Sequence, residues 1–342
     1  MTSVPTLEYS VKLDDDGVRI LDRRVFPLEE RWVLCPTVED VAVAIEQMVT
    51  QSLGPLFAAT AGMQLAARQV AQVSRDDASA RDAMHAAGAR LINTRRTNNH
   101  IRDGVTQVLL AIDAVDVLDP QTLITVVADT CTETEQLYRH SCELLGRHAA
   151  SLIPNGTRLL THCWADLYLI GLVKALIASE TDVEFLCTET RPYLQGARLT
   201  AHTLGEMGYQ PTVLTDGMPA WAMKQGMVDV VVTAADRVTM DGHVVNKIGT
   251  LQTAISAAAF DIPFHVLIQA PDLLTPTIND MTIEMRDGNE VLNLMGMRTA
   301  SPLARGIYPA FDATPPRWVT DVSTDRGVFT PEEIGEYYAN PG

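Results

Sequence analysis

Past residue 150 the chain alternates between short apolar runs and longer stretches with helical spacing. The short runs are typical of buried strands, because they are rich in β-branched residues and almost free of charge. They cover residues 157–162, 183–187, 211–215, 228–235 and 263–269. Helical stretches at 167–178 and 197–207 lie between them. This alternation predicts a Rossmann-like α/β fold, in which helices cover a doubly wound parallel sheet.

The first 150 residues have a different pattern. An alternating stretch at 7–21 predicts a β hairpin or meander, and residues 38–73 are rich in alanine at helical spacing. Gly54-Pro55 interrupts that helical stretch. Three further helices are predicted at 78–91, 100–114 and 120–145. This half is therefore expected to be mainly helical, with a short amino-terminal β segment.

The length and the change of pattern indicate two domains. A chain of 342 residues exceeds the usual size of one domain. Pro154-Asn155-Gly156 is a turn signal that separates the two patterns. We expect a mainly helical domain at 1–150 and a Rossmann-like catalytic domain at 151–342.

Two of the predicted strands end in residues that carry chemistry. Cys163 follows the strand at 157–162, and Asp236 follows the strand at 228–235. Because parallel strands present their carboxyl ends at one edge, where ligands bind in such folds, the two side chains should lie close together. Cys163 precedes a helix, whose dipole would favour a nucleophilic or basic thiolate, although a free cysteine is more often a small buried apolar group. Asp236 fits a general acid or base, or a salt bridge with Arg237.

Two more loops are expected at the same edge of the sheet. Residues 188–198 follow the strand at 183–187 and are unusually dense in Glu, Arg and Gln for a plain connection. After the turn signal Asp241-Gly242, residues 245–250 are predicted to open a helix. Asn246 and Lys247 would then form a phosphate site at a helix N-terminus, or else an ordinary cap beside a solvated lysine.

Charge and composition exclude some classes of function. The chain has 26 Lys and Arg against 43 Asp and Glu, a net charge of −17, which disfavours nonspecific binding of nucleic acid. An anionic ligand would need local positive groups, of which Lys247, Arg198 and Arg95 are the candidates. The apolar stretches are too short to span a membrane and residues 1–16 lack the features of a signal peptide, so we expect a cytoplasmic protein. Five cysteines without metal-ligand spacing indicate reduced thiols.

Several of these motifs together resemble a known family. They are THC at 161–163, ETRP at 189–192, LQGARLTA at 194–201, ADR at 235–237, NKIGT at 246–250 and PAFD at 309–312. Their order is similar to that in methylthioribose-1-phosphate isomerases. That family shares its fold with ribose-1,5-bisphosphate isomerases and with the regulatory subunits of the guanine-nucleotide exchange factor of translation initiation. The resemblance covers about residues 160–330.

The resemblance implies an isomerase that converts an aldose 1-phosphate into a ketose 1-phosphate, with a place in methionine salvage. It implies that Cys163 and Asp236 are the catalytic pair and that Gln195, Asn246 and Lys247 hold the sugar phosphate. A glycosyl phosphate has no free hemiacetal, so an acid must protonate the ring oxygen while hydrogen moves from the second carbon to the first. Asp236 fits the acid, with a pKa raised by desolvation at an apolar strand end. Cys163 fits a base or a group that shapes a site for hydride transfer, and the scheme needs no metal or cofactor.

The chain departs from the family pattern in three places. WAD at 164–166 replaces Asn-Ala-Gly, and QSLGPLFA at 51–58 replaces a segment whose arginine meets the phosphate. TRRTNNH at 94–100 retains one family arginine, Arg95, and adds Arg96. Either guanidinium could supply part of the missing charge. Trp164 adds apolar bulk beside the thiol, so we expect a sugar with a small or apolar substituent, such as methylthioribose 1-phosphate or 5-deoxyribose 1-phosphate, although a bisphosphate stays open.

Two other classes of function remain open. A catalytically silent sugar-phosphate or nucleotide sensor, as in the translation branch, would need neither Cys163 nor Asp236. A hydrolase or transferase with Cys163 as nucleophile lacks an evident base, since the adjacent His162 would point to the other side of an extended strand. We also expect a homodimer formed through the carboxyl-terminal domain, where residues 281–297 offer apolar surface.

Overall fold

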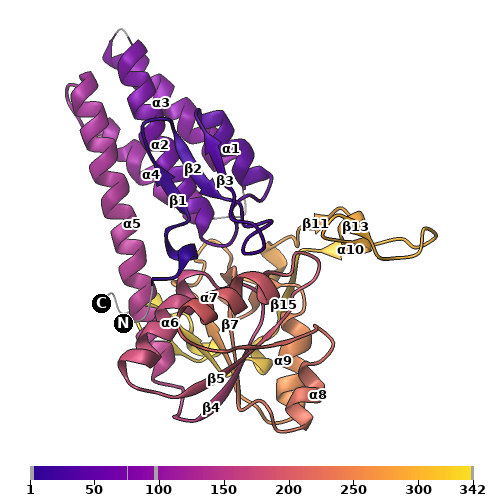
Figure 1. Cartoon of the computed structure of the whole chain (residues 1–342). Helices are drawn as coiled ribbons and strands as arrows, with labels where there is room; N and C mark the ends of the chain where they lie inside the picture. Colours follow the sequence, from indigo (N-terminus) through magenta and orange to yellow (C-terminus); the bar gives the residue numbers. More distant parts are fainter. Residues whose placement is uncertain (1–3, 75, 96–98, 340–342) are drawn as a thin grey trace. The chain divides into compact units, whose positions relative to one another are not determined.

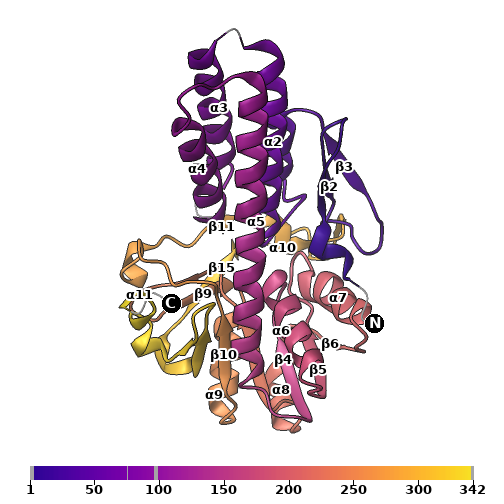
Figure 2. The ribbon, with the colours of Figure 1, turned by 90° about the vertical axis from the view of Figure 1, so that its left-hand side faces the viewer.

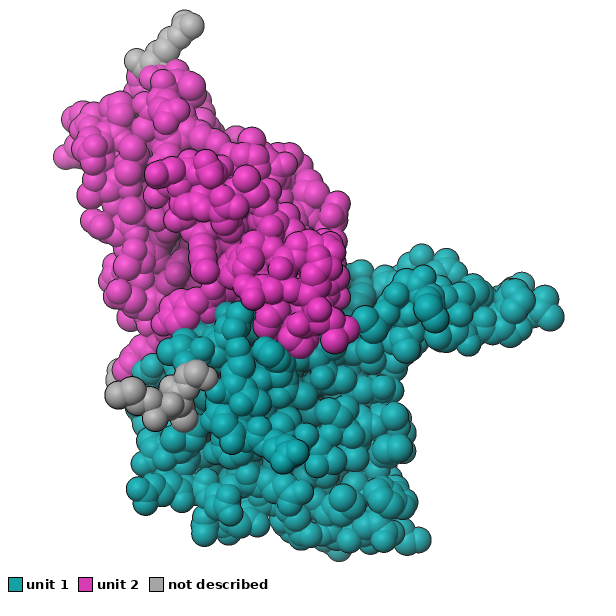
Figure 3. Space-filling model, viewed as in Figure 1, with its two compact units in different colours: residues 1–8, 141–342 teal, residues 9–140 magenta. Residues whose placement is uncertain are grey.

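The protein is described by a computed structural model covering residues 4–74, 76–95 and 99–339. Its contacts divide the chain into two units, residues 9–140 and residues 1–8 with 141–342 (Figure 3). The helix α5 (Pro120–Ala150) contains residues of both units. We keep the domain boundary after residue 150 as a proposal, at the last residue of α5.

The unit of residues 9–140 joins a small sheet to a group of helices. Its strands form an antiparallel meander, which extends the expected hairpin by a third strand: β1 (Val11–Leu13), β2 (Val18–Leu21) and β3 (Trp32–Cys35). Its helices are α1 (Val38–Glu46), α2 (Gly54–Val73), α3 (Asp77–Ile92), α4 (Asn99–Asp113) and the first part of α5. Gly54-Pro55 begins α2, which suits a proline because the first-turn N–H groups of a helix have no partner within the helix.

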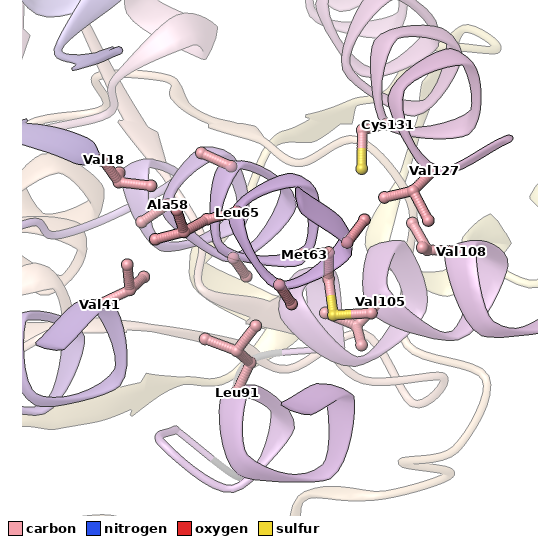
Figure 4. Packing of buried hydrophobic residues seen from close by; sticks show 14 of the residues in the cluster. Val18, Val41, Ala58, Met63, Leu65, Leu91, Val105, Val108, Val127 and Cys131 are labelled. Atoms are coloured by element: carbon pink, nitrogen blue, oxygen red, sulfur yellow. The ribbon is translucent and has the colours of Figure 1, made fainter. Parts of the chain in front are cut away.

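The core of this unit forms around α2. Fourteen of its 20 residues are buried, far more than on an amphipathic surface helix. Met63 in α2 and Leu91 in α3 are fully buried, as is Val105 in α4 (Figure 4). Alanines such as Ala58 keep the side chains of α2 small on other faces. The alanine-rich pattern of the sequence therefore corresponds to a central helix with neighbours on several sides.

The other unit is built on a seven-stranded sheet, in the order β17-β16-β10-β7-β4-β5-β6. The strands are β4 (Thr157–Thr161), β5 (Val183–Thr188), β6 (Thr212–Leu214), β7 (Val230–Ala234), β10 (Phe264–Leu267), β16 (Asp321–Ser323) and β17 (Val328–Phe329). All neighbours are parallel except β16 and β17. The predicted doubly wound α/β fold with a helical amino-terminal region is confirmed.

Four helices connect the central strands. They are α6 (Leu167–Ala178), α7 (Ala201–Glu206), α8 (Pro219–Lys224) and α9 (Thr250–Ala259). Figure 1 shows α6 and α7 on one side of the sheet and α8 and α9 on the other. The chain runs outward from β4 to β6 and then returns to β7 on the other flank of β4. The carboxyl ends of β4 and β7 therefore flank a topological switch point, where a crevice can bind a ligand.

One predicted helix start is wrong. Residues 245–250 do not open a helix, because most of them belong to a second, antiparallel sheet of β8 (Arg237–Val238), β9 (Val244–Lys247) and β15 (Phe311–Thr314) (Figure 2). The physical reason is pairing with a distant segment, since Asn246 lies opposite Asp312 and Lys247 opposite Phe311. The helix α9 begins only at Thr250, after Gly249 takes a φ of 104°.

An arm made of residues 281–307 extends from the body of the same unit (Figure 1). It contains β11 (Met285–Arg286), α10 (Asn289–Leu292), β12 (Asn293–Leu294) and β13 (Met297–Arg298), and the chain returns through β14 (Tyr308–Pro309). The remaining short elements are η1 (Thr6–Tyr9), η2 (Gly196–Thr200), η3 (Ile278–Asp280), η4 (Pro316–Trp318), η5 (Pro331–Glu333) and α11 (Glu336–Ala339). Within the described ranges, no helix is both long and apolar enough to cross a membrane.

Two glycines set the approach of α5 to α6. A Cβ atom added to Gly171 would lie 2.5 Å from the carbonyl oxygen of Cys142, and one added to Gly146 would lie 2.2 Å from the carbonyl carbon of Gly171. Real Cβ atoms do not come this close to a backbone, so α6 can pack here only with glycine at both positions.

We predict that Gly171→Ala lowers the free energy of unfolding by about 1–3 kcal/mol, the usual cost of overpacking a tight contact. Gly205→Ala in α7 is the matched control, because no heavy atom of the described residues lies within 4 Å of its added Cβ. That control should raise stability by about 0.5–1 kcal/mol, since alanine favours the helix. Urea titration of both variants measures the difference, and equal stabilities would contradict the close contact.

Candidate active site

The backbone of Cys163 is fixed in an unusual conformation at the end of β4. Its φ is 65°, in the left-handed region that side chains seldom adopt. The N–H of Cys163 donates to Thr190 Oγ1 at 3.0 Å, and Thr200 Oγ1 donates to the carbonyl oxygen of Cys163. Two threonines from the loop and helix after β5 therefore hold the residue that carries the thiol. Strain of this kind persists only where surrounding contacts impose it.

The thiol of Cys163 is neutral at physiological pH. Cys163 is buried, and burial raises the pKa of its thiol to about 11. The ammonium of Lys247 and the N–H of Trp164 act in the opposite direction, while the carboxylates of Asp236 and Asp216 raise the pKa further. Of the two readings left open by the sequence, a reactive thiolate and a small buried apolar group, the structure favours the buried group. Because α6 begins only at Leu167, the turn of positive potential at its start adds little at position 163.

These electrostatic effects also locate the neighbours of the thiol. Lys247 and Asp236 both lie within electrostatic range of the Cys163 thiol. Cys163 and Asp236 follow β4 and β7, which are neighbours in the sheet, and Lys247 is the last residue of β9. The side chain of Asp236 is exposed, and its N–H donates to the carbonyl oxygen of Val245 at 3.0 Å. The expected desolvation of Asp236 is therefore wrong. Arg237 forms a salt bridge with Asp272 at 3.1 Å.

Lys247 carries a buried ammonium group. Its residue is only 8% exposed, and Nζ lies 4.5 Å from the centre of the Phe311 ring, over its face. No carboxylate of the described residues forms a salt bridge with Lys247. The solvated lysine considered above is therefore wrong. A buried cation held by an aromatic face and not by an acid keeps its charge available for an anionic ligand.

Asn246 lies beside Lys247 on β9 and is buried as well. Its Nδ2 donates to Thr250 Oγ1 at 3.0 Å, which joins the strand to the start of α9. It does not cap that helix, because Gly249 occupies the capping position. The alternative of an ordinary asparagine cap is therefore wrong.

Gln195 is buried at the end of the polar loop that follows β5. The loop is fixed by Asp216, whose carboxylate accepts the N–H groups of Thr190 at 2.8 Å and Arg191 at 2.7 Å. Gly196 closes the loop so tightly that an added Cβ would lie 1.8 Å from the carbonyl oxygen of Thr188. Gln195 therefore has a fixed place on the loop that also holds Cys163.

His162 is a structural bridge between three segments. Its Nε2 lies 3.0 Å from the carbonyl oxygen of Ile248, which can only accept, so Nε2 carries the proton. Nδ1 then accepts a hydrogen bond from Thr188 Oγ1 at 2.6 Å. Burial lowers the pKa of His162, in agreement with a neutral ring. Both nitrogens are occupied by groups other than Cys163, which agrees with the expectation that His162 is not its base.

The three arginines noted in the sequence lie in different places. Arg198 is buried and donates to the carbonyl oxygen of Tyr193, so it supports the polar loop. Arg95 belongs to the other unit, between α3 and α4, and its contact with the phosphate stays a prediction. Arg96 lies outside the described residues.

Sequence reasoning missed Thr190, Thr200 and Asp216. Asp216-Gly217 is a turn signal after a strand and could have drawn attention to Asp216. The threonines have no such signal, because their partner is the backbone of a residue distant in sequence. Among the described residues, no group of three His, Cys, Asp or Glu could hold a metal ion. The five cysteines are free thiols, as predicted.

The chain is similar to known proteins over most of its length. The model of the initiation factor 2 subunit family matches residues 56–331. A methylthioribose-1-phosphate isomerase from Anaeromyxobacter dehalogenans is 36% identical over 92% of this chain and 91% of its own. One from Chloroflexus aurantiacus is 34% identical over 93% and 94%.

Solved structures give the same result. The crystal structure of 5-methylthioribose 1-phosphate isomerase from Pyrococcus horikoshii has a TM-score of 0.85 and is 26% identical, with 99% of both chains covered. The delta subunit of translation initiation factor eIF-2B from A. fulgidus has a TM-score of 0.83 and is 28% identical, with 97% of both chains covered. The fold thus occurs in an enzyme and in a translation factor.

The neutral state of His162 predicts a loss of stability in acid. As the pH falls below about 6.5, the usual pKa of histidine, the unfolded chain binds a proton that the folded protein does not. Wild-type stability should therefore fall between pH 7 and pH 5, by up to about 1.4 kcal/mol per pH unit for each such histidine. His162→Asn should reduce this slope without removing it, because burial also lowers the pKa of two other histidines. It lowers the pKa of His100 to about 4, and it lowers the pKa of His265 as well.

Urea titrations at several pH values measure this slope. The matched control is His140→Asn at an exposed position of α5, which should keep the wild-type slope. A wild-type slope in His162→Asn would show that folding does not lower the pKa of His162.

Proposed function

The chain belongs to the initiation factor 2 subunit family and within it to the methylthioribose-1-phosphate isomerases, and from this premise we propose its reaction and its site. It is an aldose–ketose isomerase that converts an aldose 1-phosphate into the corresponding ketose 1-phosphate. The observation that carries the proposed site is the grouping of Cys163, Asp236 and Lys247 around the switch point between β4 and β7.

Asp236 acts as the acid that opens the ring. It protonates the ring oxygen, the bond from that oxygen to the first carbon breaks, and the phosphate oxygen stabilises the cation left on the first carbon. Hydrogen then moves with its electron pair from the second carbon to the first, and the hydroxyl proton on the second carbon returns to the Asp236 carboxylate. Asp236 is again protonated at the end of the reaction, and the product is an isomer of the substrate. The phosphate charge beside Asp236 favours its protonated form at neutral pH.

Cys163 shapes the space in which the hydrogen moves. A thiol with a pKa of about 11 contains little thiolate at pH 7, which supports hydride transfer over removal of a proton by a sulfur base. It also disfavours a hydrolase or transferase with Cys163 as nucleophile. The silent sensor is disfavoured as well, because the curated relatives reported above are named as isomerases.

Lys247 binds the substrate phosphate, and Asn246 and Gln195 contribute to holding the sugar phosphate. The role of Arg95 in binding the phosphate stays a prediction. Trp164 is buried next to the thiol and limits the space around it. A polar or charged substituent would be desolvated there without a partner. The substrate is therefore methylthioribose 1-phosphate or a related sugar with a small or apolar group on its fifth carbon, such as 5-deoxyribose 1-phosphate.

Two further features complete the proposal. The enzyme is a cytoplasmic homodimer, and the exposed apolar side chains of the arm support self-association. These side chains are Met285, Met295, Met297 and Leu303. Its partner is a small phosphorylated sugar, and the net charge of −17 disfavours nucleic acid.

We predict that Asp236→Asn and Cys163→Ala each lower kcat by about 100-fold or more, while both variants stay folded. Phosphorus and proton NMR would follow the conversion of methylthioribose 1-phosphate and 5-deoxyribose 1-phosphate into ketose 1-phosphates. Asp272→Asn is the matched control, because it removes a neighbouring carboxylate that pairs with Arg237 and should keep most of the turnover. Near-normal turnover by Asp236→Asn would remove it from the reaction.

The role of Cys163 has its own tests within this experiment. Substrate deuterated at its second carbon should yield product deuterated at its first carbon, whereas a base would exchange the label with water. The wild-type kcat should also show no tenfold rise per pH unit between pH 7 and pH 9. Loss of the label together with such a rise would identify the Cys163 thiolate as a base.

We predict that Lys247→Met weakens binding of the ketose 1-phosphate about 10- to 100-fold, because the variant keeps the chain length and loses the buried charge. Binding of the unphosphorylated ketose should change little. Lys224→Met in α8 is the matched control at an exposed position and should bind as the wild type does. Calorimetric titration measures the affinities of the wild type and the two variants. If Lys247→Met binds the phosphorylated sugar as tightly as the wild type does, the phosphate binds elsewhere.

A further inference from the structure

Tyr308 has a buried hydroxyl group without a visible role in the fold. The residue is 2% exposed, and its Oη has no hydrogen-bond partner among the described residues. Folded proteins seldom leave a buried hydroxyl unpaired, because its lost hydration costs free energy. Such a group either destabilises the fold, or it forms its hydrogen bond with a ligand when the ligand binds.

The position of Tyr308 favours a ligand. Burial raises the pKa of Tyr308 above its usual range, and Tyr193 and Cys163 raise it further, so the hydroxyl lies within electrostatic range of Cys163. Its ring meets the ring of Tyr193 edge to face, with centroids 6.1 Å apart, and Tyr193 lies on the loop that holds Cys163. Three residues later, Phe311 lies under the Lys247 ammonium. Tyr308 thus packs on the loop that holds Cys163 and lies three residues before the ring that holds the Lys247 ammonium.

The backbone around Tyr308 is held rigidly. Tyr308 pairs with Arg286 across β14 and β11, and the N–H of Ala310 donates to the carbonyl oxygen of Glu284 at 2.9 Å. Close by, an added Cβ on Gly306 would lie 1.8 Å from the carbonyl oxygen of Gly288. The backbones of the two segments of the arm are therefore in direct contact at these glycines. A side chain on such a support cannot easily turn to find another partner.

The neighbouring tyrosine shows the contrast. Tyr193 donates its hydroxyl hydrogen to Glu290, whose carboxylate also pairs with Arg286. Tyr193 therefore has a structural role that ties the polar loop to the arm, and its hydroxyl is used. Tyr308 packs against the same ring, yet its own hydroxyl is left without such a partner among the described residues.

We propose that the hydroxyl group of Tyr308 binds the sugar of the substrate, donating a hydrogen bond to a hydroxyl oxygen beside the reacting carbons. The inference rests on the proposed isomerase function and adds a residue to its site. As a neutral phenol Tyr308 donates a hydrogen bond without adding charge to the site. It selects sugars that present an oxygen at this position, since an analogue without that oxygen leaves the buried phenol unpaired.

Tyr308→Phe tests the proposal, because it removes only the hydroxyl and keeps the ring. We expect kcat/KM for the aldose 1-phosphate to fall about 10- to 100-fold, the usual range for one buried hydrogen bond to a ligand. The melting temperature should stay the same or rise, because the substitution removes no hydrogen bond to any of the described residues. A merely structural hydroxyl would give the reverse result, a lower melting temperature with unchanged kcat/KM, and that would overturn the proposal.

Tyr337→Phe is the matched control in the same unit. Tyr337 is also buried, but its hydroxyl donates to Asp325 at 2.9 Å. This variant should lower the melting temperature by a few degrees and leave kcat/KM unchanged.

The outcomes also separate this inference from the proposed function. A wild type that converts no aldose 1-phosphate overturns both. A wild type that is active, together with a Tyr308→Phe variant that is equally active, overturns the role of Tyr308 alone. A deoxy analogue of the product, lacking one hydroxyl at a time, identifies the oxygen: the analogue that lacks the partner of Tyr308 should bind wild type and variant equally.

Discussion

The parallel pairing of β4 with β7 is the constraint on which the rest of the site depends. Leu159 lies opposite Val230, and Leu160 lies opposite Val231, in the middle of a sheet whose strands continue outward on both flanks. This register brings the ends of the two strands to the same level, with Cys163 after one and Asp236 after the other. A slip of one residue would reverse the faces to which the side chains of one strand point and would displace the two strand ends by about 3.3 Å along the sheet.

Around that fixed pair, the remaining groups are held by contacts that do no chemistry themselves. Thr190 and Thr200 hold the backbone of Cys163, Asp216 holds Thr190, and His162 joins β4 to β5 and to the segment before α9. Glycines occur where segments approach most closely, as Gly196 does beside Thr188. Such supporting contacts leave few conformations open to the reacting groups, which is the condition for precise positioning.

Local sequence patterns predicted the strands of the large sheet well, because β-branched apolar runs have few other stable arrangements. They also predicted that Cys163 and Asp236 share one edge. They failed at Asn246 and Lys247, where a turn signal followed by polar residues and Gly249 looks like a helix start. Pairing with β15, distant in sequence, decides that β9 is a strand. The sequence left two readings of Cys163 open, and only its burial in the folded chain favours the neutral thiol. The exposure of Asp236 could not be inferred from its apolar neighbours along the chain.

The cation over Phe311 has a consequence for the kinetics of ligand capture. At long range a protein of charge −17 repels an anion, so encounters are slow at low ionic strength, and added salt speeds them by screening that repulsion. Once the anion has entered, it meets an ammonium that is 8% exposed and therefore poorly screened. Salt should then accelerate association while changing dissociation little. In proteins that bind phosphate through an exposed basic surface, added salt slows association instead. The difference arises because here the positive charge of Lys247 is buried inside a protein with a large negative net charge.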